Sequence, residues 1–210
     1  MIHSRKRLSV IGAMLLASTA VPAYAVTFTL GNNPQADEQN VLYSASQTGT
    51  SITGLTNQTN TSVLFTSPET LQTTALGQAN LTATDGAINN VTIAVPGQTY
   101  GDLILNPLVG VPGQQSVPAT VSVIANNGTF TFNYNLTHGN NFLTILADSG
   151  QTITSTTITS SGGFADLRQV RISGISGSVP PGSAVPEPTS VLLLASGLGG
   201  LALMRRRLSQ

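Results

Sequence analysis

The central part of the chain holds few groups that could carry out acid–base or metal chemistry. Between Val26 and Ala184 there is one histidine, no cysteine and seven carboxylates: Asp37, Glu38, Glu69, Asp85, Asp102, Asp148 and Asp166. Two carboxylates on either side of a sugar could hydrolyse a glycosidic bond. Spacing along the chain does not show which two would pair, so a secreted glycoside hydrolase ranks third among the functions considered.

The histidine, His138, offers little support for catalysis. It continues the apolar phase of the segment Phe130–Leu136 and precedes a turn, which indicates a structural residue at a strand end. A Ser-His-Asp triad would need it, but the G-x-S-x-G motif of such hydrolases is absent. With no cysteine and a single histidine, a zinc site is excluded by count. We therefore expect a protein that is not an enzyme.

Calcium is a separate hypothesis, because loops of β-proteins can offer carboxylate, amide and backbone oxygens to a hard cation. The conceivable ligands are Asp37, Asp85, Asn89 and Asp148. No D-x-D-x-D-G loop is present, and Asp and Asn also occur in turns for structural reasons. Turn residues remain the favoured interpretation, and no other cofactor is indicated.

The formal net charge is zero, but the charges are segregated along the chain. Basic residues form two terminal clusters, Arg5–Arg7 and Arg205–Arg207, whereas the segment between them holds seven acids, two arginines and no lysine. A surface of this kind repels phosphate backbones, so nucleic acid is excluded as a partner. The same segment contains 26 threonines and 15 asparagines, which favour strands and turns respectively.

Alternation of apolar and polar residues predicts strands throughout this segment. The clearest window is Thr129–Thr137, in which even positions are apolar or aromatic and odd positions are polar. Ile153 and Ile158 fall out of phase, which predicts a β-bulge between them. Further strands are expected at 27–30, 41–45, 62–66, 79–84, 90–95, 102–106, 119–125, 142–147, 151–159 and 169–175.

Asn-Gly and Asp-Gly pairs mark tight turns between these strands. Turns at 126–128, 138–141 and 148–150 predict a four-stranded antiparallel meander from Ala119 to Thr159. About ten short strands without a convincing helix indicate an all-β fold, an antiparallel β-sandwich with the jelly roll as one possible arrangement. We place this domain at residues 26–177, followed by a Pro/Gly/Ser linker at 178–184.

Residues 1–25 have the three parts of an export signal. A basic start, Arg5–Arg7, is followed by an apolar run and then by Ala23 and Ala25, the small residues of a signal-peptidase site. The apolar run is short for a membrane span. We therefore expect export, with cleavage before Val26.

The C-terminal residues 185–210 form a second membrane-directed segment. Val185, Pro186, Glu187 and Pro188 precede an uncharged run, Thr189–Met204, which predicts a transmembrane helix. Arg205, Arg206 and Arg207 then remain in the cytoplasm by the positive-inside rule. The domain would therefore lie outside the inner membrane, in agreement with the N-terminal signal.

This tail resembles the PEP-CTERM sorting signal of bacteria that have an outer membrane. The resemblance implies recognition of Pro186, Glu187 and Pro188 by an exosortase, with transient anchoring in the inner membrane and removal of the tail. It further implies delivery to the cell surface or extracellular polysaccharide matrix. Asn33–Leu42 and Phe164–Ile175 are also similar, more loosely, to segments of other PEP-CTERM β-domains, which implies a shared sandwich and no particular activity.

The favoured function is a structural or adhesive component of the cell surface or biofilm matrix. The alternative is a carbohydrate-binding module, with or without calcium, that presents Tyr43, Tyr100 or Tyr134 to a sugar. Expected partners are the export machinery and signal peptidase, the exosortase, and extracellular polysaccharide.

Overall fold

The computed structural model describes residues 25–74, 77–78, 80–110, 116–148 and 150–177. The predicted export signal up to Tyr24, the linker 178–184 and the sorting tail 185–210 lie outside these residues. The described residues form strands and no helix, so none of them forms an apolar helix long enough for a membrane crossing.

The strands follow the alternating pattern closely, and each predicted strand overlaps an observed one. In chain order they are β1 (Val26–Leu30), β2 (Gln39–Tyr43), β3 (Thr48–Thr56), β4 (Ser62–Thr73), β5 (Gly77–Gln78), β6 (Asn80–Ala83), β7 (Ile88–Ala94), β8 (Gln98–Thr99), β9 (Asp102–Leu108), β10 (Val117–Ala125), β11 (Gly128–Leu136), β12 (Leu143–Ala147), β13 (Ile153–Phe164), β14 (Asp166–Ser173) and β15 (Ser176–Gly177). The sequence pattern missed β3, where Gly49 and Gly54 interrupt the alternation.

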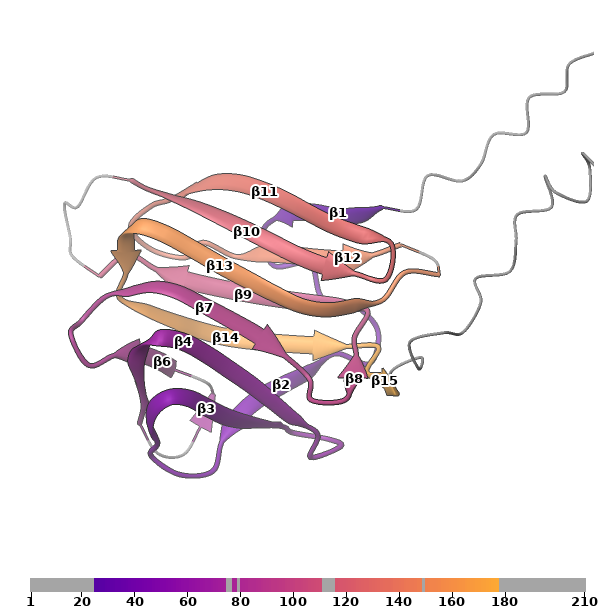
Figure 1. The fold of residues 1–210 in the computed structure, drawn as a ribbon, viewed down its shortest axis with the longest axis horizontal. Coiled ribbons are helices and arrows are strands. Elements are labelled where there is room, and N and C mark those ends of the chain that lie inside the picture. Colours follow the sequence, from indigo (N-terminus) through magenta and orange to yellow (C-terminus); the bar gives the residue numbers. More distant parts are fainter. Residues whose placement is uncertain (1–24, 75–76, 79, 111–115, 149, 178–210) are drawn as a thin grey trace, which may run out of the picture.

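Most strands belong to one continuous antiparallel sheet with the order β1-β12-β9-β14-β2-β3-β4-β7-β13-β10-β11. The sheet folds over into two layers, with β4, β7, β13, β10 and β11 facing β2, β14, β9, β12 and β1 (Figure 1). Strand β3 joins the layers on one side, and β6 pairs with both β14 and β4 on that side. The predicted antiparallel β-sandwich is confirmed.

The side opposite β3 is open. The two ends of the strand path, β1 and β11, lie there together at the top of Figure 1. They approach through side chains, because the rings of Phe28 and Phe132 stack with centroids 5.2 Å apart and planes inclined by 8°. No backbone pairing between β1 and β11 is present in the described part of the chain.

The predicted meander is correct only in its first hairpin, β10–β11. Strand β12 leaves for the other layer, where it pairs with β1 and β9, and β13 returns to pair with β10 and β7. Turn residues specify that the chain reverses, but they do not specify which layer the next strand joins. The predicted bulge in β13 is confirmed, because the register with β10 shifts so that Ile124 faces Ser155 and Ala125 faces Ile153.

The core fills the space between the layers and is formed by one cluster of side chains. All buried hydrophobic residues among those described lie between Val26 and Ile172. Strand β9 is buried on both faces: its side chains that point away from the core are as inaccessible to solvent as those that point into it. This segment contains a complete core, so we expect it to fold without the two terminal signals.

Candidate functional site

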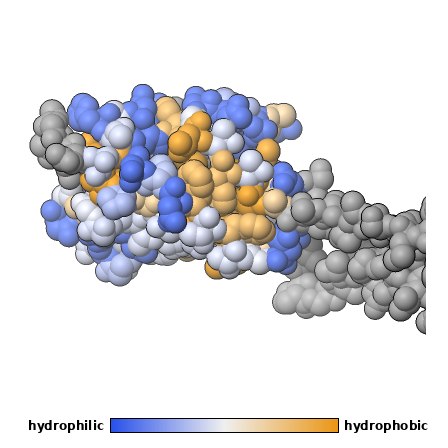
Figure 2. Space-filling view, turned by 90° about the horizontal axis from the view of Figure 1, so that it is seen from above, coloured by the Kyte–Doolittle hydropathy of each residue, from blue (hydrophilic) through white to orange (hydrophobic). Residues whose placement is uncertain are grey.

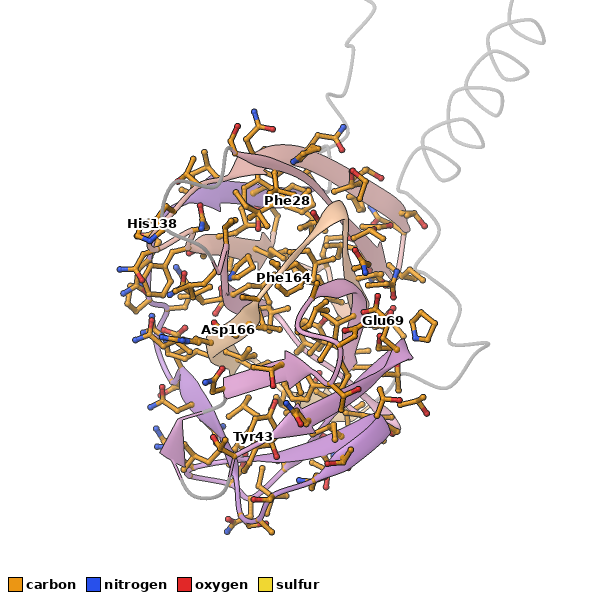
Figure 3. The ribbon with its side chains drawn as sticks, turned by 90° about the vertical axis from the view of Figure 1, so that its left-hand side faces the viewer. Phe28, Tyr43, Glu69, His138, Phe164 and Asp166 are labelled. Atoms are coloured by element: carbon orange, nitrogen blue, oxygen red, sulfur yellow. The ribbon has the colours of Figure 1, made fainter. Side chains whose placement is uncertain are left out.

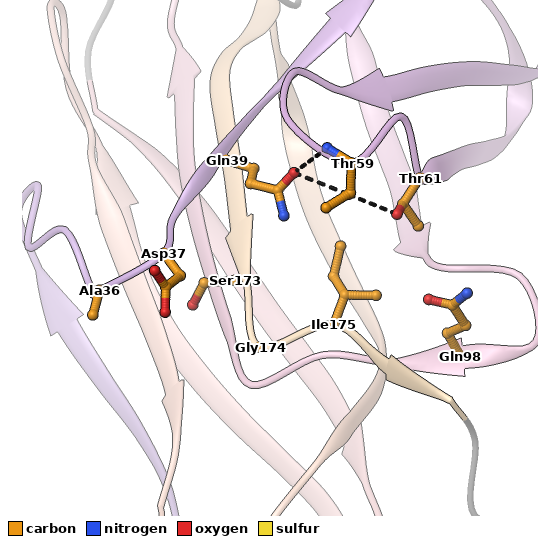
Figure 4. A pocket seen from close by; sticks show the side chains of 9 residues that line it. All are labelled: Ala36, Asp37, Gln39, Thr59, Thr61, Gln98, Ser173, Gly174 and Ile175. Carbon is orange, nitrogen blue, oxygen red and sulfur yellow. Dashed lines mark hydrogen bonds between the residues drawn. The ribbon is translucent and has the colours of Figure 1, made fainter.

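A polar pocket lies at one end of the sandwich, where four connections meet. Its volume is about 450 Å³, and its lining residues are Ala36, Asp37, Gln39, Thr59, Thr61, Gln98, Ser173, Gly174 and Ile175 (Figure 4). The Gln39 Oε1 atom accepts hydrogen bonds from the Thr59 backbone N–H and hydroxyl, each at 3.0 Å. The Thr59 and Thr61 hydroxyls are 2.8 Å apart. The wall is therefore made of ordered amide and hydroxyl groups.

Tight backbone contacts hold the floor of this pocket in place. Gly174 has a φ of 62°, a left-handed conformation that favours glycine. A Cβ atom there would lie 3.1 Å from the Gly101 backbone nitrogen, which donates a hydrogen bond to the Ser173 carbonyl. Asp37, on the β1–β2 connection, also has a positive φ of 60°.

Replacing Gly174 with alanine is expected to lower the free energy of unfolding by about 1–3 kcal/mol, from the left-handed φ and the backbone contact together. Denaturant unfolding would measure the change. Gly177→Ala is the matched control, because a Cβ at Gly177 would meet nothing within 4 Å. Equal stability of the two variants would contradict this account of the pocket floor.

A buried charge cluster lies beside the pocket. Asp102 on β9 faces Ser173 on β14 in the sheet register, and it is only 1% exposed. The Glu38 carboxylate, also buried, lies 3.8 Å from an Arg171 guanidinium nitrogen. Neither carboxylate oxygen of Asp102 accepts a hydrogen bond of ordinary geometry among the described residues, although the Ser173 hydroxyl and the Leu103 N–H lie near enough to favour its charged form. Glu38 Oε1 also lacks a partner there. Arg171 therefore forms an ion pair with Glu38 and acts on the nearby Asp102 only through its charge.

This arrangement alters the protonation of both acids. Burial raises the pKa of Asp102 to about 7, the nearby Glu38 carboxylate adds to the rise, and Arg171 offsets part of it. The pKa of Glu38 is also raised, again chiefly by burial and against the effect of Arg171. A carboxyl group with a pKa near 7 changes charge close to neutral pH, which the sequence did not indicate.

The β1–β2 connection covers the cluster and brings Glu38 to it. Its first residues are tied to β12, since Thr144 donates a hydrogen bond to the Gly31 carbonyl (2.9 Å) and accepts one from the Asn33 N–H (3.1 Å). Arg171 also donates to the Asn32 side chain. The segments Asn33–Leu42 and Phe164–Ile175 thus meet here, through β2–β14 pairing and the Glu38–Arg171 contact.

Two further carboxylates, Glu69 and Asp166, lie apart from this cluster and form local contacts that stabilise the fold. Glu69 accepts hydrogen bonds from the Asn89 backbone (2.9 Å) and side chain (2.6 Å). Asp166 forms an ion pair with Arg168 at 2.6 Å. His138 is exposed on the β11–β12 connection, on the opposite side of the view from Glu69 in Figure 3. The residues that were candidates for a catalytic carboxylate pair are thus brought together only at Glu38 and Asp102, within the described segments.

Three of the four candidate calcium ligands lie on separate connections, and the fourth, Asn89, lies on strand β7. Asp37 lines the polar pocket, Asp85 accepts a hydrogen bond from the Ala87 N–H in the β6–β7 turn, and Asp148 follows β12. Asn89 is engaged with Glu69 as described above. Across the ranges that the structure describes, no group of three or more His, Cys, Asp or Glu side chains could hold a metal ion. Calcium binding stays a hypothesis.

The aromatic residues suggested for sugar stacking are placed differently than expected. Tyr43 is 2% exposed and Tyr100 is fully buried, so neither can present its ring to a ligand. The Tyr100 hydroxyl lies 2.8 Å from the Thr156 hydroxyl inside the sandwich. Alternation placed Tyr43 on a strand but could not show that its ring points inward, and Tyr100 lies between β8 and β9, outside the predicted strands. Tyr134 is half-buried on the open side of the sandwich.

A second polar feature covers the outer face of one layer. Cross-strand neighbours form a row of hydroxyl groups through five strands, Thr66, Thr92, Thr157, Ser122 and Thr131. A parallel row contains Asn90, Thr159, Thr120 and Asn133. We call these two rows the hydroxyl face. No charged side chain stands in either row, and a shallow hollow of about 680 Å³ opens beside Thr120 and Thr159.

These features define an all-β sandwich domain with an uncharged hydroxyl face, a polar pocket and a buried carboxylate pair. Beyond this domain, residues 184–207 match the family model of the PEP-CTERM protein-sorting motif. The chain therefore carries a PEP-CTERM sorting signal at its C-terminal end, as its Val-Pro-Glu-Pro sequence predicted. The motif marks the chain as an exosortase substrate that is exported and sorted to the cell surface or envelope.

Similarity to other known proteins is low. A comparison with curated proteins finds no match. Among solved structures, a mutant of a family 29 carbohydrate-binding module is 10% identical, with a TM-score of 0.21, covering 76% of this chain and all of that one. The C-terminal receptor-binding domain of the avian reovirus fibre sigmaC is 11% identical, with a TM-score of 0.20, covering 73% of this chain and 76% of that one. Similarities this weak carry no information about function.

Proposed function

We propose that the domain is a non-enzymatic, adhesive or structural component of the extracellular polysaccharide matrix or cell surface. The sorting motif supports this proposal, since it implies export and sorting to the cell surface or envelope. The observation that carries the adhesive role is the hydroxyl face, whose rows run across four and five strands without a charge.

The chemistry of this face suits a carbohydrate polymer. Hydroxyl and amide groups both donate and accept hydrogen bonds, and a polysaccharide presents the same kinds of groups along an extended chain. Neighbouring strands lie about 4.8 Å apart, so each row repeats these groups at a regular interval. Some are already oriented, since the Thr92 and Thr157 hydroxyls are 2.8 Å apart and Thr120 donates to Asn133 Oδ1 at 2.7 Å.

The positions of the described acidic residues support a function other than catalysis. A glycosidase needs two carboxylates that reach a sugar from opposite sides. The side chains of Glu38, on the β1–β2 connection, and Asp102, on β9, are both buried, and Glu69 and Asp166 are held in local contacts.

Substituting valine for Thr120 and Thr157 removes two central hydroxyls while preserving side-chain shape and strand propensity. The domain, residues 26–184, is expected to bind the producing organism's own polysaccharide saturably. The double variant should bind about 30-fold more weakly, since each of the two lost hydrogen bonds contributes about 1 kcal/mol. A pull-down on the isolated polysaccharide, with and without a calcium chelator, would measure both.

The matched control changes Thr48 and Thr50 to valine, because both are exposed on β3 and lie off the hydroxyl face. It should bind like the wild type. Failure of the wild-type domain to bind would contradict the adhesive role. Equal binding by all three proteins would contradict the assignment to this face.

A carbohydrate-binding module that uses the polar pocket is the second candidate. The pocket offers Gln39, Thr59, Thr61 and Gln98 side chains to a small polar ligand. A pocket of this size would bind a short oligosaccharide as tightly as the polymer. The extended hydroxyl face would instead bind longer sugar chains more tightly than short ones. Competition by oligosaccharides in the same pull-down separates these two modes.

A further inference from the structure

Strand β11 is an unprotected edge on the open side of the sandwich. Among the described residues it pairs only with β10, in nine consecutive pairs without a register shift. An edge strand exposes a row of backbone N–H and C=O groups that can pair with another strand. Proteins usually protect such edges with charges, prolines, bulges or short strands. In the described part of the chain, the nine residues of β11 contain no charge and no proline, and their pairing with β10 has no bulge.

Apolar surface accompanies this edge. Phe28, Phe130, Phe132 and Tyr134 are only partly buried against the core, and Leu30 at the end of β1 is 62% exposed. Figure 2 looks onto this side of the molecule and shows apolar surface bordered by hydrophilic surface. A strand added at β11 would bury more of these rings, which is favourable in proportion to the area removed from water.

The order of residues in β11 indicates that the added strand is the β11 strand of a second copy of this chain. When two β11 strands pair antiparallel about Phe132, each Phe130 faces a Tyr134 and the two Phe132 residues face each other. On the opposite face each Thr131 meets an Asn133, and each Thr129 meets an Asn135. Aromatic pairs and hydrogen-bonded polar pairs across strands both stabilise a sheet. The Thr–Asn combination already occurs within the fold, where Thr120 on β10 donates to its cross-strand neighbour Asn133.

We propose that two copies of this domain associate through antiparallel β11–β11 pairing about Phe132. The contact is the same on both copies, so it closes as a two-fold dimer. No charge on β11 opposes the approach of a second copy. The paired layers form one continuous sheet, and the hydroxyl face continues across the contact through Thr131 and Asn133. The inference goes beyond the proposed function, because the dimer requires no polysaccharide.

Sedimentation velocity on residues 26–184, from about 1 to about 200 µM, tests the pairing. We expect a reversible dimer. Replacing Thr131 and Asn133 with lysine places like charges opposite each other across the two-fold axis and should weaken the dimer at least about tenfold. Combining Thr131→Lys with Asn133→Glu places opposite charges across the same axis and should restore the dimer at low salt.

The control adds two lysines at Ser51 and Thr53, which are exposed on β3 and pair with β4, on the side of the sandwich opposite β11. It should dimerise like the wild type, and thermal unfolding would show that all variants are folded. A monomeric wild type at the highest concentration overturns the proposal. A dimer that persists in the double-lysine variant, or is not restored by the Lys/Glu pair, overturns it as well. The polysaccharide pull-down is a separate readout, so failure of one inference leaves the other testable.

Discussion

Replacing Pro186, Glu187 and Pro188 together with alanine is expected to abolish removal of the C-terminal tail. These residues lie within the sorting motif at 184–207, and they are the part that an exosortase is expected to recognise. The uncharged run that follows would then keep the chain in the inner membrane, held by Arg205–Arg207 on the cytoplasmic side. Immunoblots of membrane and surface fractions would show the unprocessed form in the inner membrane and its loss from the surface.

Substituting alanine for Ser183, just before the motif, provides a matched control that should be processed normally. Deleting residues 185–210 separates anchoring from processing, since a chain without the tail should be exported and released. Normal surface delivery of the triple-alanine variant would contradict the assigned recognition residues.

Replacing Asp102 with asparagine is expected to stabilise the domain at pH 8 and leave its stability nearly unchanged at pH 4. Asp102 has a pKa of about 7 in the folded protein, mainly because burial penalises its charged form. In the unfolded chain its pKa should be close to the ordinary value of about 3.9. The folded state therefore binds a proton more tightly than the unfolded state.

The sign of the pH dependence follows from this difference. Between about pH 4 and pH 7 the folded protein keeps the proton that the unfolded chain has lost, so the free energy of unfolding falls as the pH rises. Above pH 7 the contribution of this group levels off. Between pH 4 and pH 8, Asp102 is expected to lower the free energy of unfolding by roughly 2–4 kcal/mol. Glu38, whose pKa is also raised, changes stability in the same direction.

Denaturant unfolding of the two proteins at several pH values would measure the Asp102 contribution together with its coupling to Glu38, because the remaining titrating groups are common to both. Asp85→Asn is the control, since Asp85 is an exposed turn residue whose contact with the Ala87 N–H an amide oxygen preserves. It should follow the wild-type profile. An Asp102→Asn profile parallel to that of the wild type would show that burial does not raise the pKa of this carboxyl group.

Local patterns predicted most of the strands and one of their irregularities. Alternation in β11 and the phase change between Ile153 and Ile158 depend on which side of a strand each residue faces, and this property repeats every two residues. The sorting tail was equally readable, because its three parts are contiguous and act as a linear signal. Strand β3 was missed because its glycines interrupt the apolar alternation.

The sequence was a poorer guide to which strands pair with each other. The turn after β11 predicted that β12 would pair with it, yet β12 lies in the opposite layer between β1 and β9. The apolar run of β12 predicts a strand that is buried on both faces. Several positions in a two-layered sandwich would bury it in this way. Only the packing of the complete chain selects one such position.

The sequence by itself determined that the chain is exported and sorted, that its domain is an all-β sandwich, and that its surface is rich in uncharged polar groups. Each of these properties follows from neighbouring residues or from composition. The tertiary structure decided that Glu38 and Asp102, 64 positions apart, come close enough to alter each other's ionisation beside Arg171, and that Tyr43 and Tyr100 are inaccessible to a ligand. It also left β11 as a free edge among the described strands. These outcomes depend on contacts between distant segments, which local periodicity and turn residues do not encode.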